Sequence, residues 1–160
     1  RIQDIDFPDP YDYSDPFQMK ITFSIPEYTL FNGESRSFTP LSARLLFKHR
    51  YLNDHLFKNL DPEERRYAFR TRSSKLIDIQ ERIALPDGAE AVYLPQEPSV
   101  DGSGAVFQAE YAEKEGHLYF SQTLILPKRI YQPEDWPSFR AAVKSQKNLA
   151  KEKVVLRIEN

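Results

Sequence analysis

Three histidines and the lack of cysteine limit the chemistry that this chain of 160 residues could perform. His49 and His55 lie six positions apart with Asp54 beside the second, and His117 stands alone. A catalytic zinc site usually draws three protein ligands, often from paired histidines on one helix, and that spacing is missing here. We therefore interpret the histidines as ordinary surface or core side chains. Without cysteine the chain has no disulfide, thiolate zinc site or cysteine nucleophile of its own.

Motifs for other catalytic chemistry are also weak. Gly102-Ser103-Gly104 is the nearest approach to the Gly-x-Ser-x-Gly motif of serine hydrolases, but it lacks a strand-to-helix elbow and is typical of a loop. The five glycines are too scattered for a phosphate-binding loop. Acidic residues number 24, so carboxylate pairs alone do not indicate a glycosidase. None of these motifs predicts a catalytic residue, a metal site or a cofactor.

Five aspartates alternate with prolines and aromatic residues at the start of the chain. They are Asp4, Asp6, Asp9, Asp12 and Asp15. An EF-hand loop counted from the first of them would need glycine at its sixth position and glutamate at its twelfth, where this chain has aspartates. We predict that residues 1–16 form an acidic, proline-rich linker, and calcium binding is the alternative.

Two sets of residues could bind a partner. The first is a basic row that could contact an acidic partner, with a solvated sheet face as the alternative. It consists of Arg66, Arg70, Arg72 and Lys75. The second set could form a platform that stacks on sugars, and it consists of Tyr119, Tyr131 and Trp136. Because Trp136 begins an apolar helical stripe, core packing is the alternative for this set.

Composition describes an ordinary soluble domain. Hydrophobic residues make up 40% of the chain, and the net charge of −2 gives no general attraction to nucleic acid. No apolar run reaches the 18 residues of a membrane span. The chain begins with Arg1 rather than methionine, so we expect it to belong to a longer polypeptide.

Alternating apolar residues predict a fold made mainly of strands. The clearest case is a hairpin over Ala105–Leu126, with Gly116 supplying the positive φ of its turn. We expect further strands over Phe17–Ile25, Arg66–Arg72 and Lys75–Leu85, a short apolar piece at Val92–Leu94, and a hairpin around Asn32-Gly33. Ala43–Leu52 could be a strand or a short helix, and we favour the strand. Aliphatic-proline pairs repeatedly end these runs, as at Leu85-Pro86.

The last third changes to a helical pattern. Gln132-Pro133-Glu134-Asp135 is typical of a helix start, and apolar residues then recur at helical spacing from Trp136 to Ala150. Lys153–Glu159 returns to alternation. We predict an antiparallel β-sandwich of about seven to nine strands over residues 17–160, with one C-terminal helix followed by a closing strand.

Several motifs resemble the C-terminal β-domain of bacterial transglutaminase-like proteins. They are Ile83-Ala84-Leu85-Pro86-Asp87-Gly88, Leu94-Pro95, Tyr111, Gly116 with Leu118-Tyr119-Phe120, and Pro133-Glu134-Asp135-Trp136-Pro137-Ser138-Phe139-Arg140. In that family an N-terminal β-domain and a papain-like Cys-His-Asp core precede such a domain. The resemblance implies a periplasmic or cell-envelope location and supplies no catalytic residue for this chain.

From this resemblance we expect a non-catalytic accessory domain. It would dock on, or position, an upstream transglutaminase-like domain of the same polypeptide. The alternative is a β-sandwich module that binds glycans or peptides through a sheet face or the loop from Gln96 to Gly104.

Overall fold

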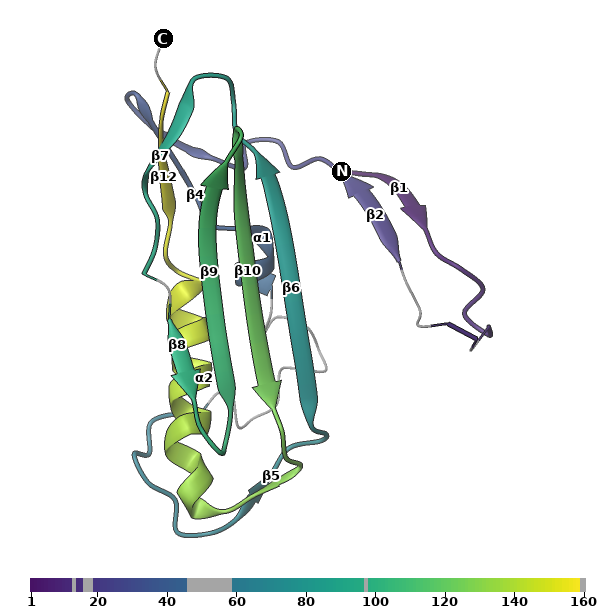
Figure 1. The fold of residues 1–160 in the computed structure, drawn as a ribbon, viewed down its shortest axis with the longest axis vertical. Coiled ribbons are helices and arrows are strands. Elements are labelled where there is room, and N and C mark those ends of the chain that lie inside the picture. The colour runs from purple at the N-terminus through teal and green to yellow at the C-terminus, as the bar shows by residue number, and fades with distance from the viewer. Residues whose placement is uncertain (13, 16–18, 46–58, 97, 159–160) are drawn as a thin grey trace. The chain divides into compact units, whose positions relative to one another are not determined.

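The computed structural model describes residues 1–12, 14–15, 19–45, 59–96 and 98–158. The chain forms two compact units, Arg1–Leu30 and Phe31–Asn160, which are described separately. In the first unit, strand β1 (Ile2–Asp6) pairs antiparallel with β2 (Lys20–Phe23), so part of the expected linker is a strand (Figure 1). Phe17 and Gln18, at the start of the strand expected over Phe17–Ile25, lie outside the described residues.

A long sheet forms the centre of the second unit (Figure 1). Its strand order is β6 (Lys75–Ala84), β10 (His117–Leu126), β9 (Val106–Lys114) and β8 (Ser99–Asp101). The predicted hairpin is the central β9–β10 pair, whose register runs from His117 opposite Lys114 to Ile125 opposite Val106. Glu115 and Gly116 turn the chain with φ of 51° and 69°.

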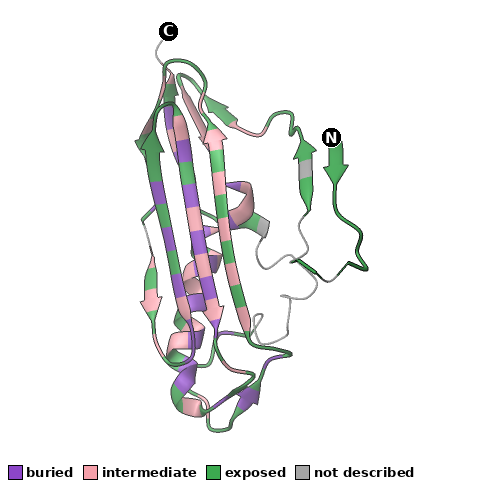
Figure 2. Cartoon of the chain, turned by 45° about the vertical axis from the view of Figure 1, so that its right-hand side comes forward, coloured by how far each residue is buried: buried purple, intermediate pink, exposed green. Residues whose placement is uncertain are grey.

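One face of this sheet is covered and the other is open, as the alternating colours along β9 and β10 show (Figure 2). The residues on the covered face are buried. They are Phe107, Ala109, Tyr111, Leu118, Phe120, Leu124 and Leu126. Their neighbours along each strand point outward and are exposed or half-buried. This is the period of two that the sequence predicted, because only one side of the sheet meets the core.

A smaller sheet joins segments that lie far apart in the sequence. Its order is β3 (Leu30–Asn32), β4 (Ser35–Phe38), β12 (Val154–Ile158) and β7 (Ala89–Tyr93). The predicted turn at Asn32-Gly33 connects β3 to β4, with Gly33 at a φ of 62°. The closing strand β12 therefore lies between two strands that come earlier in the chain.

Helix α2 (Trp136–Leu149) follows a 3-10 turn, η2 (Pro133–Asp135), and packs against β9 and β8. It lies behind the long sheet in Figure 1. Its buried stripe follows helical spacing and consists of Trp136, Phe139, Ala142, Val143, Gln146 and Leu149. Pro137 stands in the first turn, where its missing N–H costs no helical hydrogen bond.

The strand favoured at Ala43–Leu52 is wrong at its start, because Leu41–Leu45 forms helix α1. The Glu81 carboxylate accepts hydrogen bonds from the backbone N–H groups of Leu41 and Ser42, at 3.2 and 2.9 Å. A carboxylate at the first amides of a helix satisfies donors that have no partner within it. Residues 46–58, including His49 and His55, lie outside the described residues.

Two short strands complete the fold: β5 (Phe69–Arg70) pairs with β11 (Ile130–Tyr131). The strand expected over Arg66–Arg72 is thus shorter, and Tyr67 is 82% exposed whereas Phe69 is buried. The mostly β fold with antiparallel pairing, a late helix and a closing strand is confirmed. The described residues form twelve strands, of which eleven lie within residues 17–160, where seven to nine were predicted; four of the strands have only two or three residues. No helix in the described part of the chain has the length and apolar character needed to cross a membrane.

Candidate functional site

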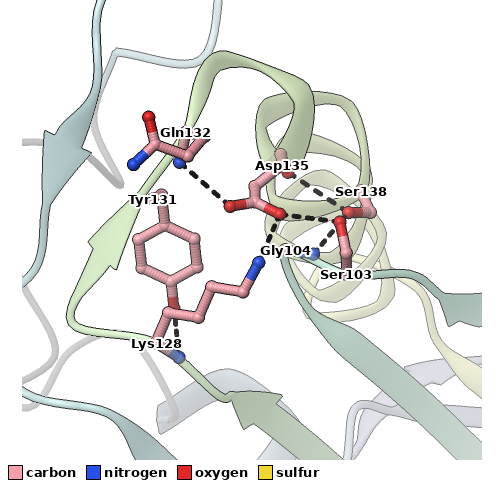
Figure 3. A network of polar contacts seen from close by, with 7 residues as sticks. All are labelled: Ser103, Gly104, Lys128, Tyr131, Gln132, Asp135 and Ser138. Carbon is pink, nitrogen blue, oxygen red and sulfur yellow. Dashed lines mark hydrogen bonds and ion pairs between the residues drawn. The ribbon is translucent and has the colours of Figure 1, made fainter.

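A buried carboxylate organises the start of α2 (Figure 3). Asp135 is 3% exposed. Its Oδ1 accepts hydrogen bonds from Lys128 Nζ at 2.6 Å and Ser103 Oγ at 2.7 Å, and its Oδ2 accepts one from the Gln132 backbone N–H at 3.0 Å. The Lys128 hydrogen bond comes first among the causes that lower the pKa of Asp135 to about 2, and the Ser103 bond follows. This carboxylate therefore stays charged and acts as an anchor rather than as an acid at neutral pH.

The Gly102-Ser103-Gly104 loop packs directly on this helix start. The Gly104 N–H donates to Ser138 Oγ at 2.9 Å, and a Cβ added at Gly104 would overlap the Asp135 carbonyl group. A Cβ at Gly102 would overlap the side chain of Ser138. Glycine is needed at both positions because the loop lies too close to the start of α2 to leave room for a Cβ atom. This agrees with the interpretation of the motif as a loop. The Ser103 hydroxyl donates to the Asp135 carboxylate, whose lowered pKa makes it a weak general base.

Four aromatic rings pack beside the carboxylate. Phe69 stacks on Tyr131 with ring centroids 4.9 Å apart, and Trp136 stacks on Phe139 at 5.7 Å. The guanidinium carbon of Arg65 lies 4.0 Å from the Trp136 ring centroid. Tyr131 and Trp136 are both 0% exposed, so they belong to the core and offer no face to a sugar.

Tyr119 lies apart from these two rings. It is 38% exposed on the open face of the long sheet, where it helps line a depression of about 530 Å³ together with Arg82 and Glu110. The predicted stacking platform is therefore not assembled, because strand alternation places Tyr119 on the opposite face from the buried Phe120.

Of the predicted basic residues, Arg70 lies in β5 and Lys75 begins β6, while Arg72 lies between these strands and Arg66 precedes β5. Arg66, Arg70 and Arg72 are exposed, and Lys75 is half-buried with its Nζ 2.9 Å from Ser73 Oγ. The β5–β11 pairing adds residues that the sequence did not single out, since Ile130 lies opposite Arg70 and the Arg129 carbonyl accepts from Thr71 N–H at 2.9 Å. We call this the basic end surface. It comprises Arg66, Tyr67, Arg70, Arg72, Lys75, Arg129 and Ile130.

The basic end surface combines unneutralised charge with exposed apolar groups. Within the described residues, the ion pairs are Lys114–Glu115 and Lys128–Asp135, and neither includes its arginines. Tyr67 and Ile130 are 82% and 61% exposed. Arginine and tyrosine beside an aliphatic side chain are typical of the central residues of protein interfaces.

A polar groove of about 670 Å³ lies between the loop after β7 and the second half of α2. Polar side chains dominate its walls: Gln96, Ser99, Ser145, Asn148 and Glu152. Tyr93, 50% exposed, is its aromatic member. The groove uses the first part of the loop that the sequence suggested for ligand binding.

The possible metal ligands among the described residues are histidine, aspartate and glutamate side chains. No group of three histidine, aspartate or glutamate side chains there is arranged to hold an ion. In the N-terminal segment, Asp9 and Asp12 accept hydrogen bonds from the backbone N–H groups of Tyr11 and Ser14, both at 2.9 Å. His117, at the β9–β10 turn, has its Nδ1 2.9 Å from the Glu115 carbonyl oxygen.

Residues 44–156 match the model of a protein family that is described as a domain of unknown function with a solved structure (DUF3858). The chain belongs to this family. No curated protein matches it. Among solved structures, the DUF3858 chain is similar to a protein of Parabacteroides distasonis ATCC 8503 that is described as a candidate protease, with a TM-score of 0.52 and 12% sequence identity. The similarity covers 61% of this chain and 19% of that one, and at this identity it shows the fold alone.

Sequence reasoning missed Arg129, Ile130 and Tyr93 in this DUF3858 chain. Arg129 and Ile130 follow Leu126-Pro127, which was interpreted only as a strand end. The adjacent basic pair Lys128-Arg129 could have pointed to this end of the sheet. Tyr93 lies in the apolar piece Val92–Leu94, whose pattern indicates burial or a strand and does not indicate ligand binding.

Proposed function

We propose that this chain is a non-catalytic accessory domain of a larger cell-envelope protein, and that it docks on and positions a transglutaminase-like catalytic domain with a papain-like Cys-His-Asp site in the same polypeptide. The observation that carries the proposal is the basic end surface. Its exposed arginines lack ion-pair partners among the described residues and stand beside Tyr67 and Ile130. A partner with an acidic face would satisfy the charges and cover the apolar groups.

Two further observations favour the role of a non-catalytic accessory domain. The similar structure described as a candidate protease is much longer than the shared region, which is 19% of its length. The motifs that resemble the C-terminal β-domain of transglutaminase-like proteins also lie at turns and in the core of this fold. The turn residue Gly116, the buried Phe120 and the buried Trp136 are three of them. A periplasmic or cell-envelope location belongs to the same proposal.

Charge reversal at the basic end surface tests the docking. The double variant Arg70→Glu/Arg72→Glu is expected to weaken binding to the separately purified upstream catalytic domain about tenfold or more, because attraction becomes repulsion. Isothermal titration calorimetry at low and high salt measures the effect. The wild-type affinity should fall as salt screens the charges.

The matched control is Lys151→Glu/Lys153→Glu, which changes the net charge equally just after α2, where both lysines are exposed. This control should bind like the wild type. Equal weakening by both double variants would mean that net charge matters rather than this surface. Unchanged affinity of Arg70→Glu/Arg72→Glu at low salt would rule the surface out.

The polar groove favours a second candidate, a module that binds glycans. Amide, hydroxyl and carboxylate groups beside one exposed aromatic ring can hydrogen-bond sugar hydroxyls while the ring packs on a pyranose face. Of the aromatic residues, Tyr93 meets this requirement, whereas the buried Trp136 does not.

A glycan array probed with the whole chain tests this candidate. A bound glycan should lose most of its signal in Tyr93→Ala and keep it in Tyr67→Ala, which removes an exposed tyrosine outside the groove. If the array gives no ligand, or if both variants retain it, the groove does not bind glycans.

A further inference from the structure

We propose that two copies of this chain associate through strand β6, edge to edge and antiparallel, so that their long sheets continue into one another. Strand β6 is the outermost strand on one side of the long sheet, and no strand among the described residues pairs with its free edge (Figure 1). It is ten residues long and pairs with β10 without a register shift. This edge is separate from the basic end surface, apart from Lys75 where β6 begins.

The backbone at this edge is oriented to bind another strand. The Leu85 N–H donates to the Gly116 carbonyl at 2.8 Å, which continues the β6–β10 register by one pair. Backbone groups alternate sides along a strand, so the odd-numbered residues of β6 bond to β10. The even-numbered residues from Leu76 to Ala84 therefore direct their N–H and C=O groups to the free edge.

The side chains select one register for a second copy. With a two-fold axis at Gln80, Asp78 of each copy lies opposite Arg82 of the other, and Leu76 lies opposite Ala84. All of these are even-numbered residues, so they form hydrogen-bonded pairs. Asp78 and Arg82 are exposed and form no ion pair with another described residue. Opposite charges facing each other across two strands stabilise the pairing.

On the covered face, the same register places Ile79 of each copy opposite Glu81 of the other, whose carboxylate binds the start of α1. There Ile77 of one copy lies opposite Ile83 of the other, and both are half-buried in the single chain. Moving the axis to Glu81 would place two glutamates opposite each other, and moving it to Ile79 would place Asp78 opposite Gln80. The register centred on Gln80 alone joins both charge pairs and both isoleucine pairs.

Strand β6 carries the charged residues Asp78, Glu81 and Arg82, but it lacks three other common protections of a free edge. Native edge strands are commonly short, bulged or interrupted by proline, and β6 has none of these features. Its inward charge, Glu81, is already used, since it binds the start of α1. A regular edge of this length is a site for strand addition.

A charge swap on the whole chain tests the pairing by sedimentation velocity over a range of concentrations. The wild type should form a dimer, and Asp78→Arg or Arg82→Asp alone should weaken it about tenfold or more. The double variant Asp78→Arg/Arg82→Asp should restore the dimer, because it recreates both charge pairs with reversed sign. A wild type that stays monomeric up to millimolar concentration, or a double variant weaker than both single ones, would overturn the proposal.

A proline at the centre of the edge gives an independent test. The Gln80 N–H points away from β10, so Gln80→Pro removes no hydrogen bond from the sheet of one copy. This variant should keep the wild-type circular dichroism spectrum and become monomeric, while Gln80→Ala stays dimeric. A Gln80→Pro protein that folds and dimerises like the wild type would show that another surface joins the copies.

Discussion

Replacing Trp136 with alanine is expected to lower the free energy of unfolding by about 3–5 kcal/mol, the usual loss for a fully buried large aromatic residue. The Trp136 ring is 0% exposed and contacts Phe139, Phe69 and the Arg65 guanidinium. Its Nε1 donates to the Pro62 carbonyl at 2.9 Å. The substitution would thus leave a cavity and remove one of the hydrogen bonds between α2 and the segment before β5, where Arg140 Nε still donates to the Leu60 carbonyl at 2.7 Å. Urea unfolding followed by circular dichroism measures the loss.

Two variants separate these contributions. Trp136→Phe keeps a ring but leaves the Pro62 carbonyl without its donor, so its loss should be smaller than that of Trp136→Ala. Tyr67→Ala removes an aromatic side chain that is 82% exposed and should change the stability by less than about 0.5 kcal/mol. A loss below about 1 kcal/mol for Trp136→Ala would mean that this ring does not hold the core together.

Acid should destabilise the chain through Asp135. The pKa of its carboxyl falls from the ordinary 3.8 to about 2 in the folded chain, so the folded state favours the charged form. The resulting stabilisation, about 2 kcal/mol, is fully present above the unfolded pKa and is lost as the pH falls from about 4 to about 2. Stability measured by urea unfolding across this range should therefore fall with acid.

Asp135→Asn should remove this part of the pH dependence and lower the stability at neutral pH by about 2 kcal/mol. The amide cannot replace the charge that Lys128 and Ser103 stabilise. Asp101→Asn, at an exposed position of β8, is the matched control and should keep the wild-type pH profile. An Asp135→Asn variant as stable as the wild type at neutral pH would contradict the role of Asp135 as an anchor.

The long hairpin could be predicted from the sequence because apolar and polar residues alternate within each of its two strands. One face of β9 and β10 meets the core, so buried and outward residues alternate without a break. Helix α1 could not be predicted in the same way. Its backbone is held by Glu81, Gln122 and Gln146, which lie far along the chain. Local pattern cannot reveal a helix whose stabilising partners are remote.

The candidate surfaces were predicted in part. The arginines of the basic end surface were visible as a row, but Arg129 and Ile130 join it only because β11 pairs with β5. The aromatic platform did not form, since burial rather than residue type decides what a ring contacts. Trp136 and Tyr131 lie in the core, and Tyr119 lies on the open sheet face.

The position of β12 between β4 and β7 has a consequence for biosynthesis. On a ribosome, residues 35–38 and 89–93 emerge long before residues 154–158, and the small sheet cannot join its two halves until that last strand is made. Closing such distant contacts slows folding. During translation, β4 and β7 therefore have unpaired edges until β12 has been made. Chaperones would be needed in this period.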